Sequence, residues 1–177
     1  MSDITSIDAL EALYGTPGEA SIIKVADHIT PLYVKWLAAS RFMVLTTVGP
    51  EGTDGSPRGD IGPVVQVLDE TTLLLPDWRG NNRMDSLRNI VRDGRVSLMF
   101  LVAGSNTAIR VNGRAVVNDD TDMLERFEQK GRHPRTVIKV TVSEIYTQCA
   151  RALIRSEIWT SGDQSQGFPS VGDFLAE

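Results

Sequence analysis

The sequence predicts a mainly β domain, in which about six antiparallel strands form a closed or partly split barrel with few helices around it. Runs of β-branched and aromatic residues recur along the chain. Most connections between these runs are short and rich in Gly, Pro, Asn and Asp, as in hairpins. One helical segment falls between the third and fourth runs and another before the last. This pattern differs from the regular strand–helix alternation of a doubly wound sheet.

Residues 1–40 are expected to form a helical arm ahead of the barrel. A short amphipathic helix is predicted over 6–14 and a second helix over 19–28. Pro31 is well placed to begin a third helix, because proline suits the first helical position. No chemistry is assigned to this arm, and His28 is interpreted as structural or solvent-exposed.

Residues 41–160 are expected to form the barrel, and residues 161–177 a loosely ordered tail, within a single domain overall. Between the first two strands lies a turn over 49–55, and a helix is predicted from Asp120 to Lys130. Pro57, Gly59, Gly62 and Pro63 lie before and within the second strand. They favour a bulged or edge strand whose backbone lies very close to another group. The six predicted strands cover residues 42–48, 61–68, 73–75, 95–102, 107–117 and 135–146.

The strongest candidate for chemistry is a strand–loop–helix unit over residues 73–94. Asn81 or Asn82 is expected to cap the helix, and Gly94 suits its left-handed end. Loop amides and a helix N-terminus favour bound anions, and guanidinium groups donate paired hydrogen bonds to phosphate. An ordinary capped helix with solvated arginines explains the same residues, so both interpretations stay open here. The side chains available to an anion are Arg79, Arg83 and Ser86.

Residues 107–117 alternate in character along the predicted strand. Arg110, Asn112 and Arg114 fall on one face, opposite Ile109 and Val111. Such a face is either solvated or lines a polar site, and the sequence alone leaves these alternatives open.

Composition excludes several classes of protein. The chain has 177 residues, which suits one domain, and its net charge of −5 argues against a general nucleic-acid binder. No apolar run approaches the roughly 20 residues of a membrane span, and the acidic N-terminus does not resemble a signal peptide.

Cys149 is the only cysteine, so we expect a cytoplasmic protein without an internal disulfide, in which this thiol is structural rather than catalytic. Zinc motifs and common nucleotide loops are absent, so any enzymatic reactivity is expected to come from a bound organic cofactor.

Five ordered segments between about Arg41 and Trp159 carry a resemblance to a known family. They are TTVGPEGTDGSPRGD, LLLPDWRGNNRMDSLRNI, RVSLMFLV, IRVNGRA and CARALIRSEIW. Together they resemble the pyridoxamine 5′-phosphate oxidase-related flavoproteins, and most closely a subgroup with SPRGD and GNNRxDSLRN signatures. The resemblance implies a six-stranded antiparallel FMN-binding split barrel that forms a homodimer, with FMN at the subunit interface. No metal is expected, because the chain lacks a zinc ligand set.

The resemblance also implies cofactor-binding roles for residues in four of these segments. The strand segment with Ser56, Arg58, Gly59 and Asp60 would run along the flavin, and its arginine would contact the phosphate. Asn81, Asn82, Arg83 and Ser86 would hold the phosphate at the loop and helix start, which agrees with the anion site inferred above. Arg110, Asn112 and Arg114 would lie near the flavin ring, and Arg155 and Trp159 would reach the cofactor from the other subunit. No catalytic residue is implied.

Two departures from the family pattern limit the expected function. Authentic oxidases carry an Arg-Xaa-His element near the C-terminus and an Arg-Lys pair at the phosphate helix. This chain has no such element after Trp159, and it has Arg83-Met84 at the helix. The FMN expectation therefore carries over, but the vitamin B6 substrate does not. We expect an FMN-dependent oxidoreductase acting on an unidentified small molecule; the alternatives are a flavin-binding or flavin-reductase-like module and a cofactor-free interaction dimer.

Overall fold

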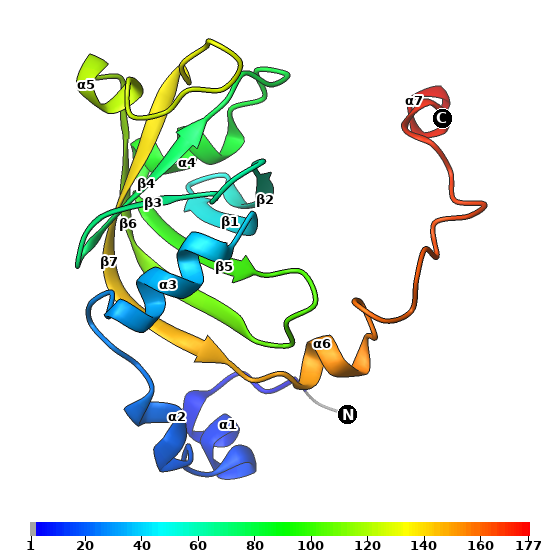
Figure 1. Cartoon of the computed structure of the whole chain (residues 1–177). Helices are drawn as coiled ribbons and strands as arrows, with labels where there is room; N and C mark the ends of the chain where they lie inside the picture. Colours follow the sequence, from blue (N-terminus) through cyan, green and yellow to red (C-terminus); the bar gives the residue numbers. More distant parts are fainter. Residues whose placement is uncertain (1–2) are drawn as a thin grey trace.

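The computed structural model describes residues 3–177 and contains one seven-stranded sheet that curls into a split barrel (Figure 1). Every strand pair is antiparallel, in the order β2-β1-β5-β6-β7-β4-β3. The predicted mainly β class is confirmed, although the sheet has seven strands rather than six. The strands are β1 (Phe42–Gly49), β2 (Gly52–Gly59), β3 (Gln66–Asp69), β4 (Thr72–Asp77), β5 (Arg95–Leu101), β6 (Ala108–Asn118) and β7 (Thr136–Gln148).

The extra strand arises because the region predicted as one bulged strand, with a turn before it, forms two strands at opposite edges. β2 pairs with β1 from Phe42↔Gly59 to Gly49↔Gly52, whereas β3 pairs with β4. No residue of β2 is buried. An edge strand of this kind is held by backbone pairing and tolerates Pro57, so its composition carries little β signal.

The core fills the inside of the curled sheet. Alternate residues of β1 and β5 point inward, so Met43, Leu45, Leu98 and Phe100 are fully buried. Burial of a side chain of this size contributes roughly 1.5–3 kcal/mol each. The long β6 and β7 strands connect the two halves of the sheet, and Figure 1 shows β7 running along its full height.

Gly113 lies at a break in the register of the β6–β7 pair. The shift falls between Asn112 and Gly113. A Cβ atom at Gly113 would lie 2.1 Å from the Thr141 carbonyl oxygen, so only glycine permits this close approach. Such a bulge increases local twist and helps the long strands bend around the core.

The N-terminal helices are α1 (Ile7–Tyr14), α2 (Glu19–Ile23) and α3 (Pro31–Ala39). The first and third match the predicted helices, and α3 buries Leu37 in the core. The prediction that the second helix reaches residue 28 is wrong. Ala26 instead pairs with Ile145 of β7 through two backbone hydrogen bonds of 3.0 and 2.8 Å, which requires extended backbone.

Helix α4 (Asp85–Arg92) connects β4 to β5 along the chain. It packs against β1 and β2. Gly94 follows it with φ +81°, as predicted for a left-handed helix end. The predicted cap at Asn81 or Asn82 is wrong, because the helix begins after Met84. The Asn81 side chain instead accepts a hydrogen bond from the Arg83 amide at 3.0 Å, which stabilises a turn ahead of the helix.

The remaining helices are α5 (Thr121–Leu124), α6 (Arg151–Arg155) and α7 (Val171–Ala176). The helix predicted up to Lys130 is thus one turn long. In the tail, Ser170 and Asp173 form a capping box at the start of α7. Figure 1 shows this tail extending away from the barrel, and Phe174 and Leu175 are exposed. None of the helices formed by residues 3–177 has the length and apolar character that a membrane crossing requires.

Candidate functional site

A cavity of about 330 Å³ opens where the two flanks of the curled sheet approach each other. Strand β2 forms one wall, and the end of β4 with the loop that follows it forms the other. The first turn of α4 and the start of β7 complete the lining. The side chains that carry polar chemistry there are Ser56, Arg58, Asp77, Arg79, Asn81, Asn82, Arg83, Ser86, Arg135 and Thr136.

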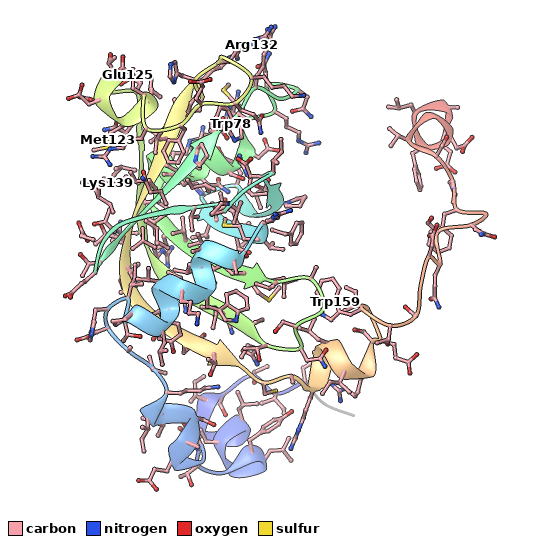
Figure 2. All side chains as sticks on the ribbon, viewed as in Figure 1. Trp78, Met123, Glu125, Arg132, Lys139 and Trp159 are labelled. Atoms are coloured by element: carbon pink, nitrogen blue, oxygen red, sulfur yellow. The ribbon has the colours of Figure 1, made fainter. Side chains whose placement is uncertain are left out.

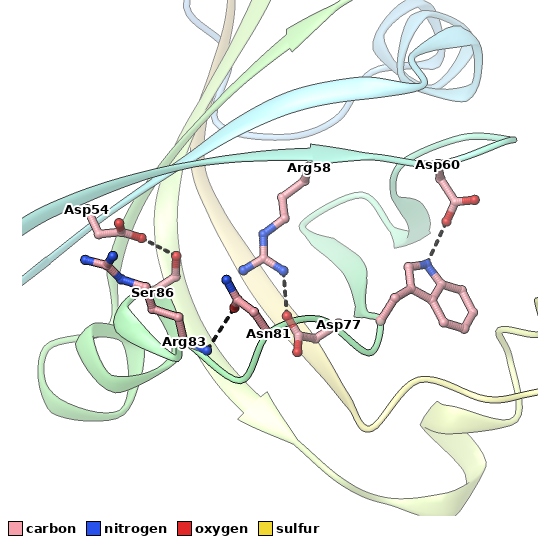
Figure 3. Close-up of polar contacts among 8 residues, drawn as sticks. Asp54, Arg58, Asp60, Asp77, Asn81, Arg83 and Ser86 are labelled. Carbon is pink, nitrogen blue, oxygen red and sulfur yellow. Dashed lines mark hydrogen bonds and ion pairs between the residues drawn. The ribbon is translucent and has the colours of Figure 1, made fainter. Parts of the chain in front are cut away.

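Arg58 belongs to the cavity lining and is held there by an ion pair. Its Nη1 atom donates to Asp77 Oδ1 at 2.5 Å, and the two side chains are only 21% and 18% exposed (Figure 3). The Arg58 Nε atom is buried and has no hydrogen-bond partner among the described residues, and the same is true of Thr136 Oγ1. A buried polar atom without a partner costs roughly 1–3 kcal/mol. Arg58 and Thr136, which both belong to the lining, therefore each keep one polar atom without a partner.

Arg83 stands at the mouth of the cavity on a tightly shaped loop. Asn82 has φ +62°, a left-handed conformation that asparagine tolerates, and its Oδ1 accepts a 2.8 Å hydrogen bond from Arg135. The Arg83 side chain is 80% exposed and donates to Asp85 at 2.5 Å, a contact that raises the pKa of Arg83. An exposed pair of this kind is weak, so Arg83 can exchange its partner for a bound anion.

The charge of the cavity is opposite to that of the whole chain. Four arginines and one carboxylate line it, although the chain carries a net charge of −5. Guanidinium groups match the paired oxygens of phosphate and carboxylate groups. The arrangement can therefore bind an anion, which favours the anion site over solvated arginines. Within the part of the chain that the structure describes, no cluster of His, Cys, Asp and Glu could hold a metal ion.

Asp60 acts beside the cavity rather than in its lining. Its Oδ2 accepts from Trp78 Nε1 at 2.8 Å, and its Oδ1 accepts from Gln129 Nε2 at 3.2 Å. Asp60 therefore fixes the Trp78 ring at the cavity edge. Gly59 pairs with Phe42 at the end of β2 and does not line the cavity. Ser86, by contrast, lines it and donates a hydrogen bond to Asp54 (Figure 3).

The polar face predicted on β6 lies elsewhere. Asn112 and Arg114 line a separate hollow of about 570 Å³ on the sheet. Asn112 donates to Glu144 at 2.6 Å, and Arg114 donates to the Asp93 carbonyl oxygen at 2.6 Å. Arg110 lies over the ring of Tyr146, 5.4 Å from its centre. None of the three β6 residues lines the Arg58 cavity.

The two predicted residues near the C-terminus also lie apart from the Arg58 cavity. Trp159 donates from Nε1 to the Ser105 carbonyl oxygen at 2.8 Å, and it lies far from Trp78 in Figure 2. Arg155 is exposed at the end of α6. Contact of either residue with the Arg58 cavity would require a second subunit, and the proposal that they reach a cofactor from such a subunit stays a prediction.

Four residues of the cavity with polar side-chain groups escaped the sequence-based assignment: Asp77, Trp78, Arg135 and Thr136. The register of β4 and β7 places Thr136 opposite Asp77 and so brings the start of β7 to the cavity. The pairing of two strands so distant in sequence could not be inferred from local patterns.

Comparison with known proteins identifies related folds. The chain matches the pyridoxamine 5′-phosphate oxidase family over residues 29–149. HupZ from Group A Streptococcus is 15% identical, covers 68% of this chain and 94% of its own, and superposes with a TM-score of 0.55. A candidate pyridoxamine 5′-phosphate oxidase from Lactobacillus delbrueckii is 25% identical, covers 68% and 95% of the two chains, and has a TM-score of 0.52. No curated protein matches this sequence.

Proposed function

The chain belongs to the pyridoxamine 5′-phosphate oxidase family, and we propose that it binds flavin mononucleotide (FMN) with the flavin phosphate in the Arg58 cavity. The observation that carries this proposal is the cationic lining of the cavity, in which four arginines face the single carboxylate of Asp77. A phosphate oxygen is an acceptor of the required charge and size.

Several side chains would share the phosphate. Asp77 holds Nη1 of Arg58, which orients the guanidinium group in the cavity lining. Arg83 and Arg135 lie at the exposed side and can turn toward an added negative charge. Ser86 and Thr136 provide hydroxyl groups on the opposite walls. Such a site combines two or more charge-assisted hydrogen bonds, each contributing roughly 1.5–3 kcal/mol.

We take the activity to be that of an FMN-dependent oxidoreductase acting on a small molecule. FMN, when bound, supplies hydride or single-electron exchange, a capacity that ordinary side chains lack. The residues of this chain bind and orient the ligand and shield it from water. The absence of an Arg-Xaa-His element in the last 18 residues supports a substrate other than a vitamin B6 phosphate.

The ligand assignment is tested by comparing FMN with riboflavin, which has the same ring system but no phosphate. Flavin-free protein is titrated with each ligand, and quenching of flavin fluorescence reports binding. We expect FMN to bind at least about 100-fold more tightly than riboflavin, equivalent to roughly 2.7 kcal/mol from the phosphate contacts. Equal affinities would contradict a phosphate site in the Arg58 cavity.

The reaction class is tested separately, on protein loaded with FMN. Anaerobic mixing with NADH or NADPH, followed by loss of the oxidised-flavin absorbance, would indicate a flavin-reductase-like activity. If neither nicotinamide reduces the flavin, a panel of small reduced substrates under the same conditions tests the oxidase class. Protein that binds FMN but is reduced by none of these would contradict the proposed oxidoreductase activity.

A further inference from the structure

A second cavity, of about 770 Å³, adjoins the proposed phosphate site. The two cavities share Trp78, Arg79 and Arg135 as common lining residues. The two cavities are therefore immediate neighbours in the structure. The remaining residues of the second cavity are Gln129, Lys130, Arg132 and His133, all between α5 and β7.

The outer wall of the second cavity is a rigid turn. Gln129 and Arg132 exchange backbone hydrogen bonds of 2.9 and 3.1 Å. Lys130 and Gly131 between them have φ of +53° and +71°, as in a two-residue type I′ hairpin turn. The turn is anchored to the chain just after β2, because the Gln129 side chain donates to Asp60. His133 Nδ1 lies 2.7 Å from the Phe127 carbonyl oxygen, which fixes the chain just after the turn.

All of the permanently charged side chains that line this cavity are positive. Arg79, Lys130, Arg132 and Arg135 contribute four positive charges, and no carboxylate belongs to the described lining. Together the two cavities gather six of the 18 Lys and Arg side chains of the chain, against the single carboxylate of Asp77. Clustered like charges repel one another in the folded protein, so a ligand with several negative charges matches this lining.

Trp78 supplies a flat wall at the junction of the two cavities. Its indole is held in place by the Nε1 hydrogen bond to Asp60, so the ring is already oriented. Stacking of a nucleobase on an aromatic ring contributes roughly 1–3 kcal/mol. A fixed aromatic face next to a row of cations fits a ligand that combines an aromatic base with phosphate groups.

We propose that the second cavity binds an adenine nucleotide, with its phosphates on Arg79, Lys130 and Arg132 and its base against Trp78. This inference rests on the proposed function, because it places the nucleotide next to the flavin phosphate. The same chemistry can come from two sources. One is the adenylate half of FAD, which is joined to the flavin through that phosphate, and the other is a free nucleotide bound beside FMN.

The test compares wild-type protein with the double variant Lys130→Asn/Arg132→Gln and with the control Arg126→Gln. Asparagine keeps the left-handed turn, since it tolerates φ above zero. Arg126 is an exposed arginine outside both cavities. Affinities for FMN and FAD are measured by flavin fluorescence, and ADP is titrated by calorimetry into FMN-saturated and into flavin-free protein.

If the adenylate belongs to FAD, the double variant lowers FAD affinity at least about 10-fold and leaves FMN affinity unchanged. If the nucleotide is free, ADP binds wild-type protein with a Kd below ~1 mM, and the double variant weakens it by the same factor. The control variant matches wild type in either case. Unchanged FAD affinity together with no ADP binding would overturn the inference. If FMN fails to bind, the proposed function is wrong. ADP binding to the flavin-free protein still tests the nucleotide site in the second cavity independently.

Discussion

Arg58 and Asp77 connect the two flanks of the sheet through their side chains. Four strands separate β2 from β4 in the order of the sheet, yet the Arg58 guanidinium donates to the Asp77 carboxylate at 2.5 Å. The Trp78–Asp60 hydrogen bond makes a second connection between the same two regions (Figure 3). Three of the four residues in these contacts, Arg58, Asp77 and Trp78, also line the candidate site.

Replacing Arg58 with methionine should destabilise the flavin-free protein. The change leaves the largely buried Asp77 carboxylate without its cation, so we expect the free energy of unfolding to fall by about 1–3 kcal/mol. Urea unfolding measures the loss, and adding Asp77→Asn should restore part of it. Arg92→Met is the matched control, because the exposed Arg92–Glu51 pair should contribute less than about 1 kcal/mol. Equal losses in the two variants would contradict a structural role for the Arg58 pair.

Replacing Arg83 with alanine should weaken FMN binding without affecting the fold. Arg83 is exposed and pairs only weakly with Asp85, so stability should change by less than about 0.5 kcal/mol. Loss of one charge-assisted bond to phosphate should lower FMN affinity roughly 10- to 100-fold. Riboflavin affinity should not change, since riboflavin has no phosphate. Fluorescence titration of both ligands measures this, and an unchanged FMN affinity would remove Arg83 from the site.

Replacing Gly113 with alanine should disturb the bend in β6. The added methyl group would meet the Thr141 carbonyl oxygen at 2.1 Å, a contact that requires the backbone to move. We expect a loss of about 1–3 kcal/mol in the free energy of unfolding. Gly55→Ala on β2 is the control, because no atom lies within 4 Å of its Cβ position. A Gly113→Ala protein as stable as the control would show that the bulge is not needed.

Cys149 should react with iodoacetamide at lower pH than an ordinary thiol. It is exposed after β7, rather than packed as a structural residue, and a hydrogen bond from the Arg151 amide lowers the pKa of its thiol. A lowered pKa means more thiolate at a given pH, and the thiolate is the reactive form. In the folded protein, the rise of the alkylation rate with pH should therefore occur at lower pH than in the same protein unfolded in urea. FMN binding by Cys149→Ser should equal that of wild type; a loss would implicate this thiol in the site.

The proposed homodimer predicts a species of twice the chain mass of 19.4 kDa. The outer face of β1 and β5 exposes Phe42 and Met99, apolar side chains that a second subunit can cover. Met99→Lys should therefore shift the protein toward monomer in sedimentation equilibrium across a concentration series. A wild-type monomer that binds FMN with full affinity would contradict both the dimer and a shared site containing Trp159.

The strands rich in apolar residues could be predicted from the sequence, because their composition and their burial agree. β1, β5, β6 and β7 fall within two residues of their predicted bounds. β2 could not be predicted, since its pairing with β1 depends on backbone hydrogen bonds and its residues remain unburied. The second helix was predicted too long because the Ala26–Ile145 pairing, formed across more than half of the chain, overrides local helix propensity.

The candidate site could be predicted only where its residues are close in sequence. Asn81, Asn82, Arg83 and Ser86 lie on one loop and helix, and the structure brings Ser56 and Arg58 to them. Thr136 and Arg135 come from a strand about 50 residues later, and only the β4–β7 register reveals them. Five predicted residues lie outside this cavity in the single chain. The place of Arg110, Asn112 and Arg114 near the flavin ring stays a prediction, as does the contact of Arg155 and Trp159 with the cofactor of a second subunit.

The position of the cavity across the split has a consequence for hydrogen exchange. When β2 separates from β4, the Arg58–Asp77 contact and both cavity walls come apart together, so a ligand bound between them must leave first. Amide protons that exchange only through this opening should therefore exchange more slowly as ligand is added. At a free ligand concentration of 100 times Kd the slowing should approach about 100-fold, equivalent to roughly 2.7 kcal/mol. Amides at the N-terminal end of α1, far along the chain, should exchange at the same rate with and without ligand.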